Sequence, residues 1–538
     1  MGKNCFANAG SLSVANLMKK IFQSDSFWLT LILVLAIFLY FWKIGQWQYL
    51  SYDEARDYII IKRILVDKKF TLIGPSLGVL DGGYLPPFYY YWLVPSLLLS
   101  KFHIWGPDVF SATLAISAVI AFYMVAKNFF GKFPALIGGL FFVFNPYLIQ
   151  AARHTRDPHM LPLFLLIFIF SFKKFLIDKK SWFLLTAAIS LGIAVSLHLT
   201  VAVFLPLLVF LFFQEFKKRG FSKVLSLSFL GLIIFFLPLV FFDLRHDFSL
   251  SRAVLSFLAG KGGLAFERIL WLKTERLVVF LIKLPLIFFS GTFQKALLSL
   301  RAMPFSSIER INIFSVSNRI EQIKLILSVI LWITTIVVTL PRATERKLKI
   351  VFIFVFFGFL ISFMCPQKAC FLYYFYSLFP FFFLLLSGAI FFLWEKSSQR
   401  KRIALTILLV AMAIMPFFPD GLKTEIRPEK YFLPVCQIIA NDFPQGKKVA
   451  IVSNVGDFLR WEHNALEYRY FLEAIYKQPL GGWGVDDYKT ADILYFIDEG
   501  EFKDPLNFNG MEMEMFAPKK ISEIWKANSG QKIYKMEK

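Results

Sequence analysis

The chain has 538 residues, of which 57% are hydrophobic and 18% aromatic, and its mean hydropathy is +0.60. Soluble domains carry about 45–50% apolar residues, so this excess excludes an ordinary soluble protein. The formal net charge is +22, but the basic residues lie between long apolar runs, as the positive-inside rule places them in membrane proteins. We therefore expect an integral membrane protein that binds membrane lipids and no nucleic acid.

The first apolar run, residues 26–42, predicts an uncleaved membrane span. It is longer than the core of a signal peptide, which has about 7–15 residues, and no small-residue cleavage site follows it. A spanning helix needs roughly 17–25 predominantly apolar residues. Eleven spans meet this requirement: 26–42, 109–126, 133–150, 158–177, two helices within 181–214 that break near His198, 224–242, 325–341, 350–366, 369–394 and 403–419.

Two further segments, 85–100 and 277–293, would raise the count to 13. Both are interrupted by proline, and their aromatic or charged residues are typical of helices that lie in the membrane interface. With eleven spans, six basic clusters fall on one side of the membrane: 19–20, 127–132, 173–180, 217–223, 342–349 and 396–402. We therefore predict about 11 transmembrane helices, with a cytoplasmic N-terminus.

This topology places loops 43–108 and 243–322 outside the cytoplasm, together with all six histidines. Residues 420–538 also lie outside and have the composition of a soluble protein. Their apolar patterns predict strands at 449–453 and 491–498 and a helix within 457–477, which indicates a small α/β domain with a parallel strand pair. The predicted organisation is a transmembrane domain over 1–419 and an extracytoplasmic domain over 420–538, acting as a lid or an acceptor-binding module.

The first candidate site is Ser51-Tyr52-Asp53-Glu54-Ala55-Arg56-Asp57-Tyr58, directly after the first span. A carboxylate between lipid and water can have a raised pKa and act as a general base. Alternatively, Asp53 caps the amphipathic helix that follows it. The sequence leaves both interpretations open.

Two other external segments combine acids with bases. Arg153-His154-Thr155-Arg156-Asp157-Pro158-His159 suits an anionic group such as a lipid phosphate, or else Asp157 caps the following helix. In Asp243-Leu244-Arg245-His246-Asp247, Arg245 and His246 could hold a phosphate, or Arg245 pairs with a neighbouring acid. No cofactor is expected with certainty. A divalent metal shared by Asp53 and Asp157 has weak support, because two separated carboxylates make a poor signature.

The order of these features resembles the polytopic glycosyltransferases of the GT-C fold, which include the aminoarabinose transferase of lipid A and the protein O-mannosyltransferases. Asp53-Glu54 resembles that family's acidic pair in the first external loop, and Asp157-Pro158 its second acidic motif. The run Pro86-Pro87-Phe88-Tyr89-Tyr90-Tyr91-Trp92 is similar to its proline-rich interfacial segment. The specific matches cover only about residues 1–210, although the overall pattern covers most of the chain.

This resemblance implies transfer of a hexose or pentose from a polyprenyl-phosphate donor to a lipid, glycan or protein acceptor outside the cytoplasm of a bacterial or archaeal cell. Asp53 would be the catalytic base, with Glu54 and Asp157 beside it. The leaving lipid phosphate would be met by Arg153, Arg156, Arg245 and His246. Tyr84-Leu85 departs from the pattern, because the aminoarabinose transferase carries Glu-Lys there, and this puts lipid A in doubt as the acceptor.

Two other classes of function compete with this interpretation. A transporter or lipid flippase would need polar residues at mid-membrane, and the predicted spans carry almost no charge at their centres. A non-catalytic scaffold would leave Asp53, Asp157 and Arg245 free to change without loss of function.

Overall fold

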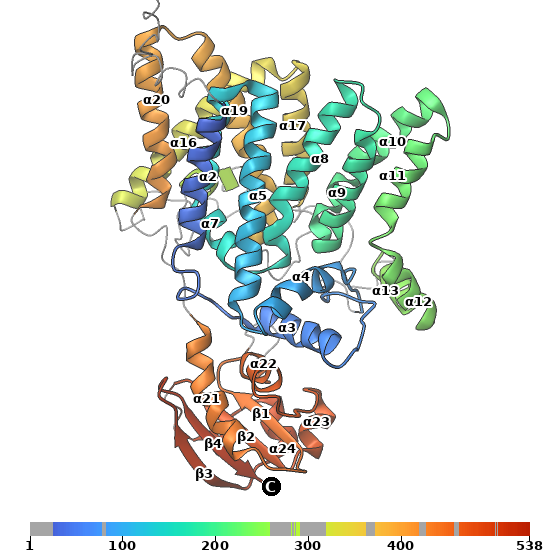
Figure 1. Cartoon of the computed structure of the whole chain (residues 1–538), viewed down its shortest axis with the longest axis vertical. Helices are drawn as coiled ribbons and strands as arrows, with labels where there is room; N and C mark the ends of the chain where they lie inside the picture. Colours follow the sequence, from blue (N-terminus) through green and yellow to red (C-terminus); the bar gives the residue numbers. More distant parts are fainter. Residues whose placement is uncertain are drawn as a thin grey trace, which may run out of the picture.

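The computed structural model describes residues 25–77, 82–258, 319–361, 372–418, 427–456, 462–500 and 504–538, together with 281, 284–285, 287–290 and 502. The helices up to residue 418 form a bundle, and residues 427–538 fold around a sheet at one end of it (Figure 1). Most of the predicted segment 277–293 and much of loop 243–322 lie outside the described residues.

A helix occurs at each of the eleven predicted spans. Their bounds are α2 (Asp25–Phe41), α5 (Trp105–Phe130), α6 (Lys132–Val143) with α7 (Pro146–Arg153), α8 (Leu161–Leu176), α9 (Phe183–Leu197), α10 (Leu205–Arg219), α11 (Lys223–Ile233) with α12 (Leu237–Arg245), α16 (Arg319–Thr339), α17 (Arg346–Phe359), α19 (Phe379–Glu395) and α20 (Gln399–Ile414). Short 3₁₀ helices adjoin several of them: η1 (Asp157–Met160), η2 (Leu199–Phe204), η5 (Leu340–Arg342), η6 (Leu372–Leu378) and η7 (Met415–Phe417).

Five of the described helices are by themselves long and apolar enough to cross a membrane, or seven if each of two bent pairs counts as one span. Of the other four predicted spans, α2 and α9 are shorter apolar helices, and α17 and α20 have 14 and 16 residues, so eleven spans stay a prediction. The predicted break is at His198, which ends α9 and caps η2 by accepting from the amide of Thr200.

Two predicted straight spans are bent in the structure. Helices α6 and α7 meet at 64°, and α11 and α12 at 57°. Pro146 begins α7, and Pro238 stands in the first turn of α12. Because a proline ring clashes with the carbonyl four residues before it, neither helix can continue through its proline.

Two helices, α3 (Tyr52–Leu65) and α4 (Phe88–Leu99), lie across the end of the bundle that faces the sheet (Figure 1). This is the orientation predicted for 85–100, and it is typical of helices that lie in a membrane interface. Helices α12 and α13 (Ser249–Leu258) lie at the same level to one side.

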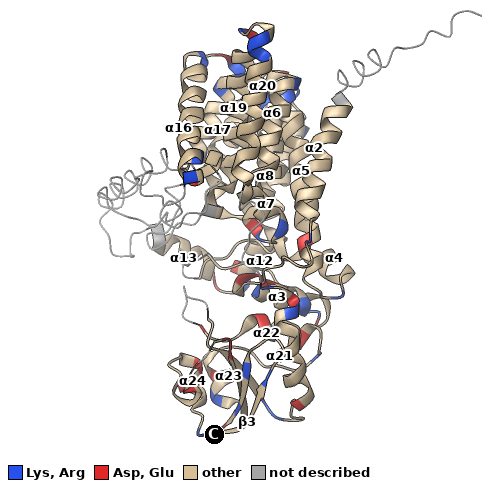
Figure 2. Ribbon diagram, turned by 90° about the vertical axis from the view of Figure 1, so that its left-hand side faces the viewer, with Lys and Arg blue, Asp and Glu red and all other residues tan. Residues whose placement is uncertain are grey.

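Charge is concentrated at the two ends of the bundle (Figure 2). Lysine and arginine gather at the end farthest from the sheet, where Lys173 and Lys174 pair with Asp178. Charges of both signs gather at the end near α3, and the bundle between is almost uncharged. This distribution is what a membrane slab around the bundle requires.

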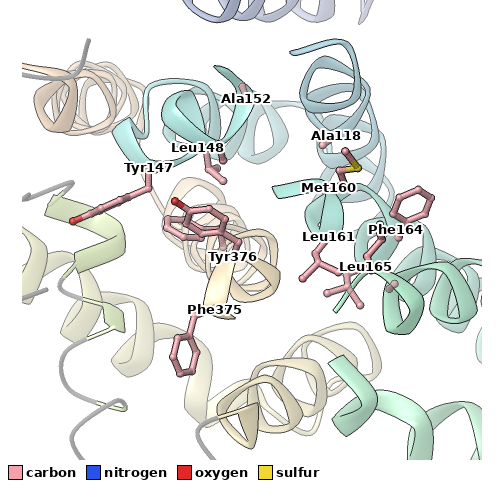
Figure 3. Close-up of a cluster of buried hydrophobic side chains, with 14 of the residues drawn as sticks. Ala118, Tyr147, Leu148, Ala152, Met160, Leu161, Phe164, Leu165, Phe375 and Tyr376 are labelled. Atoms are coloured by element: carbon pink, nitrogen blue, oxygen red, sulfur yellow. The ribbon is translucent and has the colours of Figure 1, made fainter. Parts of the chain in front are cut away.

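A buried hydrophobic cluster joins α5, α7, α8 and η6 within the bundle (Figure 3). Ala118 of α5, Tyr147 and Leu148 of α7, Met160 of η1 and Phe164 of α8 are all buried there. Phe375 and Tyr376 of η6 complete it, and Tyr376 packs against the ring of His159 at 5.1 Å. The cluster anchors both ends of the connection between α7 and α8, which carries residues 154–157.

The sheet has the strand order β1-β2-β4-β3. The helices and strands of residues 427–538 are α21 (Glu429–Asp442), β1 (Val449–Ser453), α22 (Leu466–Ala474), α23 (Val485–Thr490), β2 (Ile493–Asp498), η8 (Pro505–Asn507), α24 (Met511–Phe516), β3 (Lys520–Lys526) and β4 (Lys532–Glu537). The predicted parallel pair is present, because Val449 of β1 aligns with Ile493 of β2 and the register continues to Ser453 and Ile497. Strands β3 and β4, which the sequence did not indicate, add an antiparallel edge.

Candidate active site

Ser51 immediately precedes α3 and supplies its N-cap. The carboxylate of Glu54 accepts from the backbone N–H of Ser51 at 3.1 Å and also from its hydroxyl, which is the return half of a capping box. Asp53 stands in the first turn of the helix and is not the cap. Of the two interpretations that the sequence left open, capping by Asp53 is therefore wrong, because a serine two residues earlier takes that position.

Arg56 lies between two carboxylates of the same helix. Its Nη1 contacts Asp53 Oδ1 at 3.0 Å, and its Nη2 contacts Asp57 Oδ1 at 2.8 Å. Tyr90 of α4 donates from its hydroxyl to the same oxygen of Asp57 at 3.2 Å. The side chain of Asp57 is only 8% exposed, whereas that of Asp53 is 49% exposed. Asp53 is therefore the member of this chain of contacts that a second molecule can reach.

Glu54 forms a third ion pair in the site, with Arg156. Arg156 donates from Nε to Glu54 at 2.5 Å and from Nη2 to the hydroxyl of Ser51 at 2.9 Å. Its guanidinium also lies 5.9 Å from the ring centre of Tyr373. The planar fork of arginine thus joins α3 to the connection between α7 and α8, two segments about a hundred residues apart.

Asp157 completes the group. The charges that act on its carboxyl include those of Asp57, Asp53, Arg56 and Arg156. If all groups are ionised, the four carboxylates of Asp53, Glu54, Asp57 and Asp157 exceed the two guanidinium groups by two negative charges. The site therefore holds more carboxyl groups than guanidinium groups, and it lies between the apolar bundle and the sheet.

Burial raises the pKa of Asp57 to about 6, against the opposing effect of Arg56 and with a further increase from Asp53. Desolvation disfavours the ionised carboxylate, and the arginine restores only part of the lost stabilisation. Asp57 therefore changes its charge close to physiological pH.

Arg153, which the sequence suggested as a phosphate ligand, is turned away from this group. It is 1% exposed and donates to the carbonyl oxygens of Leu39 and Trp42, at 3.1 and 2.6 Å. Its guanidinium lies 5.0 Å from the ring centre of Trp47. These contacts satisfy the carbonyls at the end of α2, where no intrahelical donor is available, so they support a structural role.

Arg245 and His246 are exposed at the end of α12. His246 stacks on Phe242, with ring centres 4.1 Å apart, and Asp243 accepts from the amides of Leu250 and Ser251 at the start of α13. No described contact joins Arg245 or His246 to the acidic group, and α12 lies to one side of α3 in Figure 1. Among the described residues, no three histidine, cysteine, aspartate or glutamate side chains are placed to hold a metal ion.

The sequence placed Asp57 in the first candidate site and Tyr90 in the proline-rich segment, but it gave neither of them, nor Tyr373, a role in the site. A signal for Asp57 was available, since it follows Asp53 by four residues and so shares its helix face. Tyr373 belongs to the predicted span 369–394, and aromatic residues near the end of a span are typical of an interfacial belt. Its position beside Arg156 depends on the packing of η6 against the end of α8, which no local pattern shows.

A known family model matches part of the chain. It is the family described as dolichyl-phosphate-mannose-protein mannosyltransferase, and the match covers residues 85–242. This stretch begins just before the proline-rich segment and ends within α12, so it contains Arg156 and Asp157. No curated protein matches the sequence.

Solved structures with the same arrangement of elements cover far more of the chain. ArnT from Cupriavidus metallidurans bound to undecaprenyl phosphate has 13% sequence identity and a TM-score of 0.57, over 95% of this chain and 98% of that one. The same protein in its apo state gives 12% and 0.56 over the same shares. The oligosaccharyltransferase from Archaeoglobus fulgidus gives 12% and 0.51, over 87% of this chain and 67% of that chain.

The chain therefore has the GT-C fold, as the acidic and proline-rich motifs indicated. The family match and the shared fold together support a membrane glycosyltransferase.

Proposed function

We propose that this protein transfers a sugar from a polyprenyl-phosphate donor to a lipid, glycan or protein acceptor at the extracytoplasmic membrane surface. The observation that carries the proposal is the half-exposed carboxylate of Asp53, which Arg56 holds at the edge of a group of buried carboxylates. The solved ArnT structure that contains undecaprenyl phosphate supports the class of donor. The position of the acidic group, beside helices that lie across the end of the bundle, suits two amphiphilic substrates that meet at an interface.

In the proposed reaction Asp53 accepts the proton of an acceptor hydroxyl while the hydroxyl oxygen attacks the anomeric carbon of the donor. The bond between that carbon and the phosphate oxygen breaks, and its electron pair leaves with the lipid phosphate. Arg56 holds Asp53 in place through one nitrogen and is itself held by Asp57 through another. Glu54 has a positioning role, because its carboxylate is taken up by Arg156 and the cap of α3.

The negative charge that develops on the leaving phosphate requires a cation at the site. Arg156 meets this requirement best, since it lies at the acidic group and is 29% exposed. Arg245 and His246 are exposed but belong to α12, so in this mechanism they would contact only a part of the donor that extends along the side of the bundle. Arg153 would act indirectly, through the end of α2 that it holds.

The test is sugar release from radiolabelled polyprenyl-phosphate sugars in proteoliposomes, with wild type, Asp53→Asn and the control Asp178→Asn. The amide keeps the shape of Asp53 but cannot accept the proton. Asp178 is a carboxylate at the opposite end of the bundle, where it pairs with Lys173 and Lys174. We expect at least a hundredfold loss of rate in Asp53→Asn, within the range that a positioned general base contributes, and no loss in the control.

Equal rates for wild type and Asp53→Asn with an accepted donor would refute the catalytic role of Asp53. Transport of a labelled lipid across the bilayer without release of sugar would instead favour the alternative, a transporter or lipid flippase.

A further inference from the structure

A second polar site lies at the other end of α3. It is a cavity of about 980 Å³ between the last turn of α3, the end of α4 and the segment that follows α22. Its walls come from three parts of the sequence, which contribute Lys62, Lys101 and Lys477 among others. Lys62 stands nine residues after Asp53, so at 1.5 Å per residue the two lie about 14 Å apart along the helix.

The lining of this cavity is strongly basic. Its charged members are Lys62, Arg63, Lys69, Lys101, Lys477, Asp67 and Glu473, so the cations exceed the carboxylates by three. The two carboxylates already have partners, because Lys62 contacts Asp67 at 3.3 Å and Glu473 at 3.8 Å, and Arg63 contacts Glu473 at 3.7 Å. In the part of the chain that the structure describes, Lys69, Lys101 and Lys477 form no ion pair.

Large apolar side chains surround the cavity and face outward. Val66 and Leu98 line it and are 55% and 56% exposed, while Leu99 and Phe70 beside them reach 80% and 72%. Exposed apolar groups of this size next to a basic cavity mark a surface that meets lipid or another apolar partner. They belong to the ends of α3 and α4 and to the turns that follow them, and both helices lie across the end of the bundle in Figure 1.

We propose that this cavity binds the phosphorylated headgroup of an anionic lipid, with the acyl chains against Val66, Leu98 and Leu99. Lysine ammonium groups form short charge-assisted hydrogen bonds with phosphate oxygens. A cluster of basic side chains at a membrane surface attracts anionic headgroups, and the apolar surround distinguishes a lipid from free phosphate. This site lies apart from the acidic group and does not depend on the proposed transfer reaction.

The backbone conformation at two of the lysines allows a substitution that removes charge without disturbing the fold. Lys101 and Lys477 follow the ends of α4 and α22 and adopt left-handed conformations, with φ of 54° and 57°. Glycine is the usual residue at such a position because it has no Cβ to strain. Replacing both lysines by glycine removes two charges from the cavity without adding strain, so lost binding would not reflect failed folding.

The experiment measures binding of three probes to the full chain in detergent, from the concentration dependence of the thermal unfolding midpoint. The probes are short-chain phosphatidic acid, short-chain phosphatidylcholine and inorganic phosphate. The variants are Lys101→Gly with Lys477→Gly, the glutamine pair at the same positions, and the control Lys526→Gln on exposed β3. No sugar donor is present, so the result is independent of the proposed function.

We expect wild type and the control to bind phosphatidic acid more tightly than either other probe. Both double variants should bind phosphatidic acid about tenfold more weakly, which is the effect of losing two partly exposed charge contacts. Without ligand, the unfolding midpoint of the glycine pair should not fall below that of wild type. Unchanged affinity in both double variants would overturn the proposal. Equal affinity for inorganic phosphate would also overturn the proposal, because it would show that the apolar side chains do not contribute to binding. Equal affinity for phosphatidylcholine would overturn it as well, because it would show that the negative charge of the lipid does not contribute.

Discussion

The carboxyl group of Asp57 is paired with Arg56 and is almost fully buried. Burial raises its pKa to about 6, whereas the unfolded chain has the ordinary value of 3.8. Between about pH 4 and pH 6 the folded protein therefore binds more protons than the unfolded one, so its stability falls as the pH rises through this window. The full effect corresponds to about 2–3 kcal/mol, from 1.36 kcal/mol for each unit of pKa.

The substitution Asp57→Asn tests this directly. The amide cannot ionise, so the free energy of unfolding of the variant relative to wild type should improve by about 2–3 kcal/mol from pH 4 to pH 6. Chemical unfolding in detergent at several pH values measures the difference. Parallel pH profiles for the two proteins would show that Asp57 is charged throughout this range.

At the scale of the element, the α6–α7 break is held by one side chain. The side-chain oxygen Oδ1 of Asn145 accepts from the backbone amides of Tyr147 and Leu148 at 3.1 and 3.3 Å. Its side-chain NH₂ donates to the backbone carbonyl of Phe288 at 2.7 Å. Asn145→Ala should cost about 1–2 kcal/mol of stability, because it removes the cap of α7. Asn145→Ser keeps a capping oxygen and should lose less. Thermal unfolding of both variants measures the ranking, and equal loss would exclude capping as the main contribution.

Helix packing depends on a close approach at Gly138. A Cβ there would lie 2.2 Å from the hydroxyl oxygen of Ser387 on α19. Gly138→Ala should therefore destabilise the protein by about 1–3 kcal/mol through overpacking, whereas Gly45→Ala, which has no atom within 4 Å of the new methyl, should be neutral. Adding Ser387→Ala should recover part of the loss. Additive losses in the double variant would contradict this contact.

The elements also show how far sequence reasoning reaches. Long apolar runs predicted all the helices at the eleven spans, and the buried character of β1 and β2 predicted their parallel pairing. Strands β3 and β4 were missed because lysine and glutamate interrupt their apolar residues and β3 is largely exposed. Only the pairing of β4 with β2, and of β3 with β4, makes them strands. Likewise, the local sequence indicated the acidic pair Asp53 and Glu54, but the contact of Arg156 with Glu54 is a tertiary contact that no local pattern predicts.

At the scale of the whole molecule, Arg427 joins the sheet region to the connection between α2 and α3. Its backbone pairs with Gln48 and Leu50, and its guanidinium contacts Glu467 at 3.2 Å and Glu499 at 2.7 Å. Burial raises the pKa of Glu467 to about 7 although Arg427 lowers it, from an ordinary value of 4.5. The folded state thus binds extra protons between about pH 4.5 and pH 7, and its stability falls as the pH rises through that interval.

Hydrogen exchange at the amides of Leu50 and Arg427 reports on this junction. In wild type, after correction for intrinsic exchange rates, protection of these amides should decrease as the pH rises from about 4.5 to 7. In Glu467→Gln the decrease should be absent, since the amide does not titrate. Glu523→Gln, at a carboxylate that is 50% exposed on β3, should behave as wild type. If Glu467→Gln retains the decrease, another group is responsible.

Helix α3 has its acidic first turn in one site and its basic last turn in the other. Its 14 residues make a rigid rod of about 21 Å. A tilt of about 10° around its centre would carry each end about 2 Å in opposite directions, which exceeds the tolerance of a hydrogen bond. If a molecule that binds in the basic cavity tilted α3 in this way, it would also change the position of the Asp53 carboxylate at the other end of the helix.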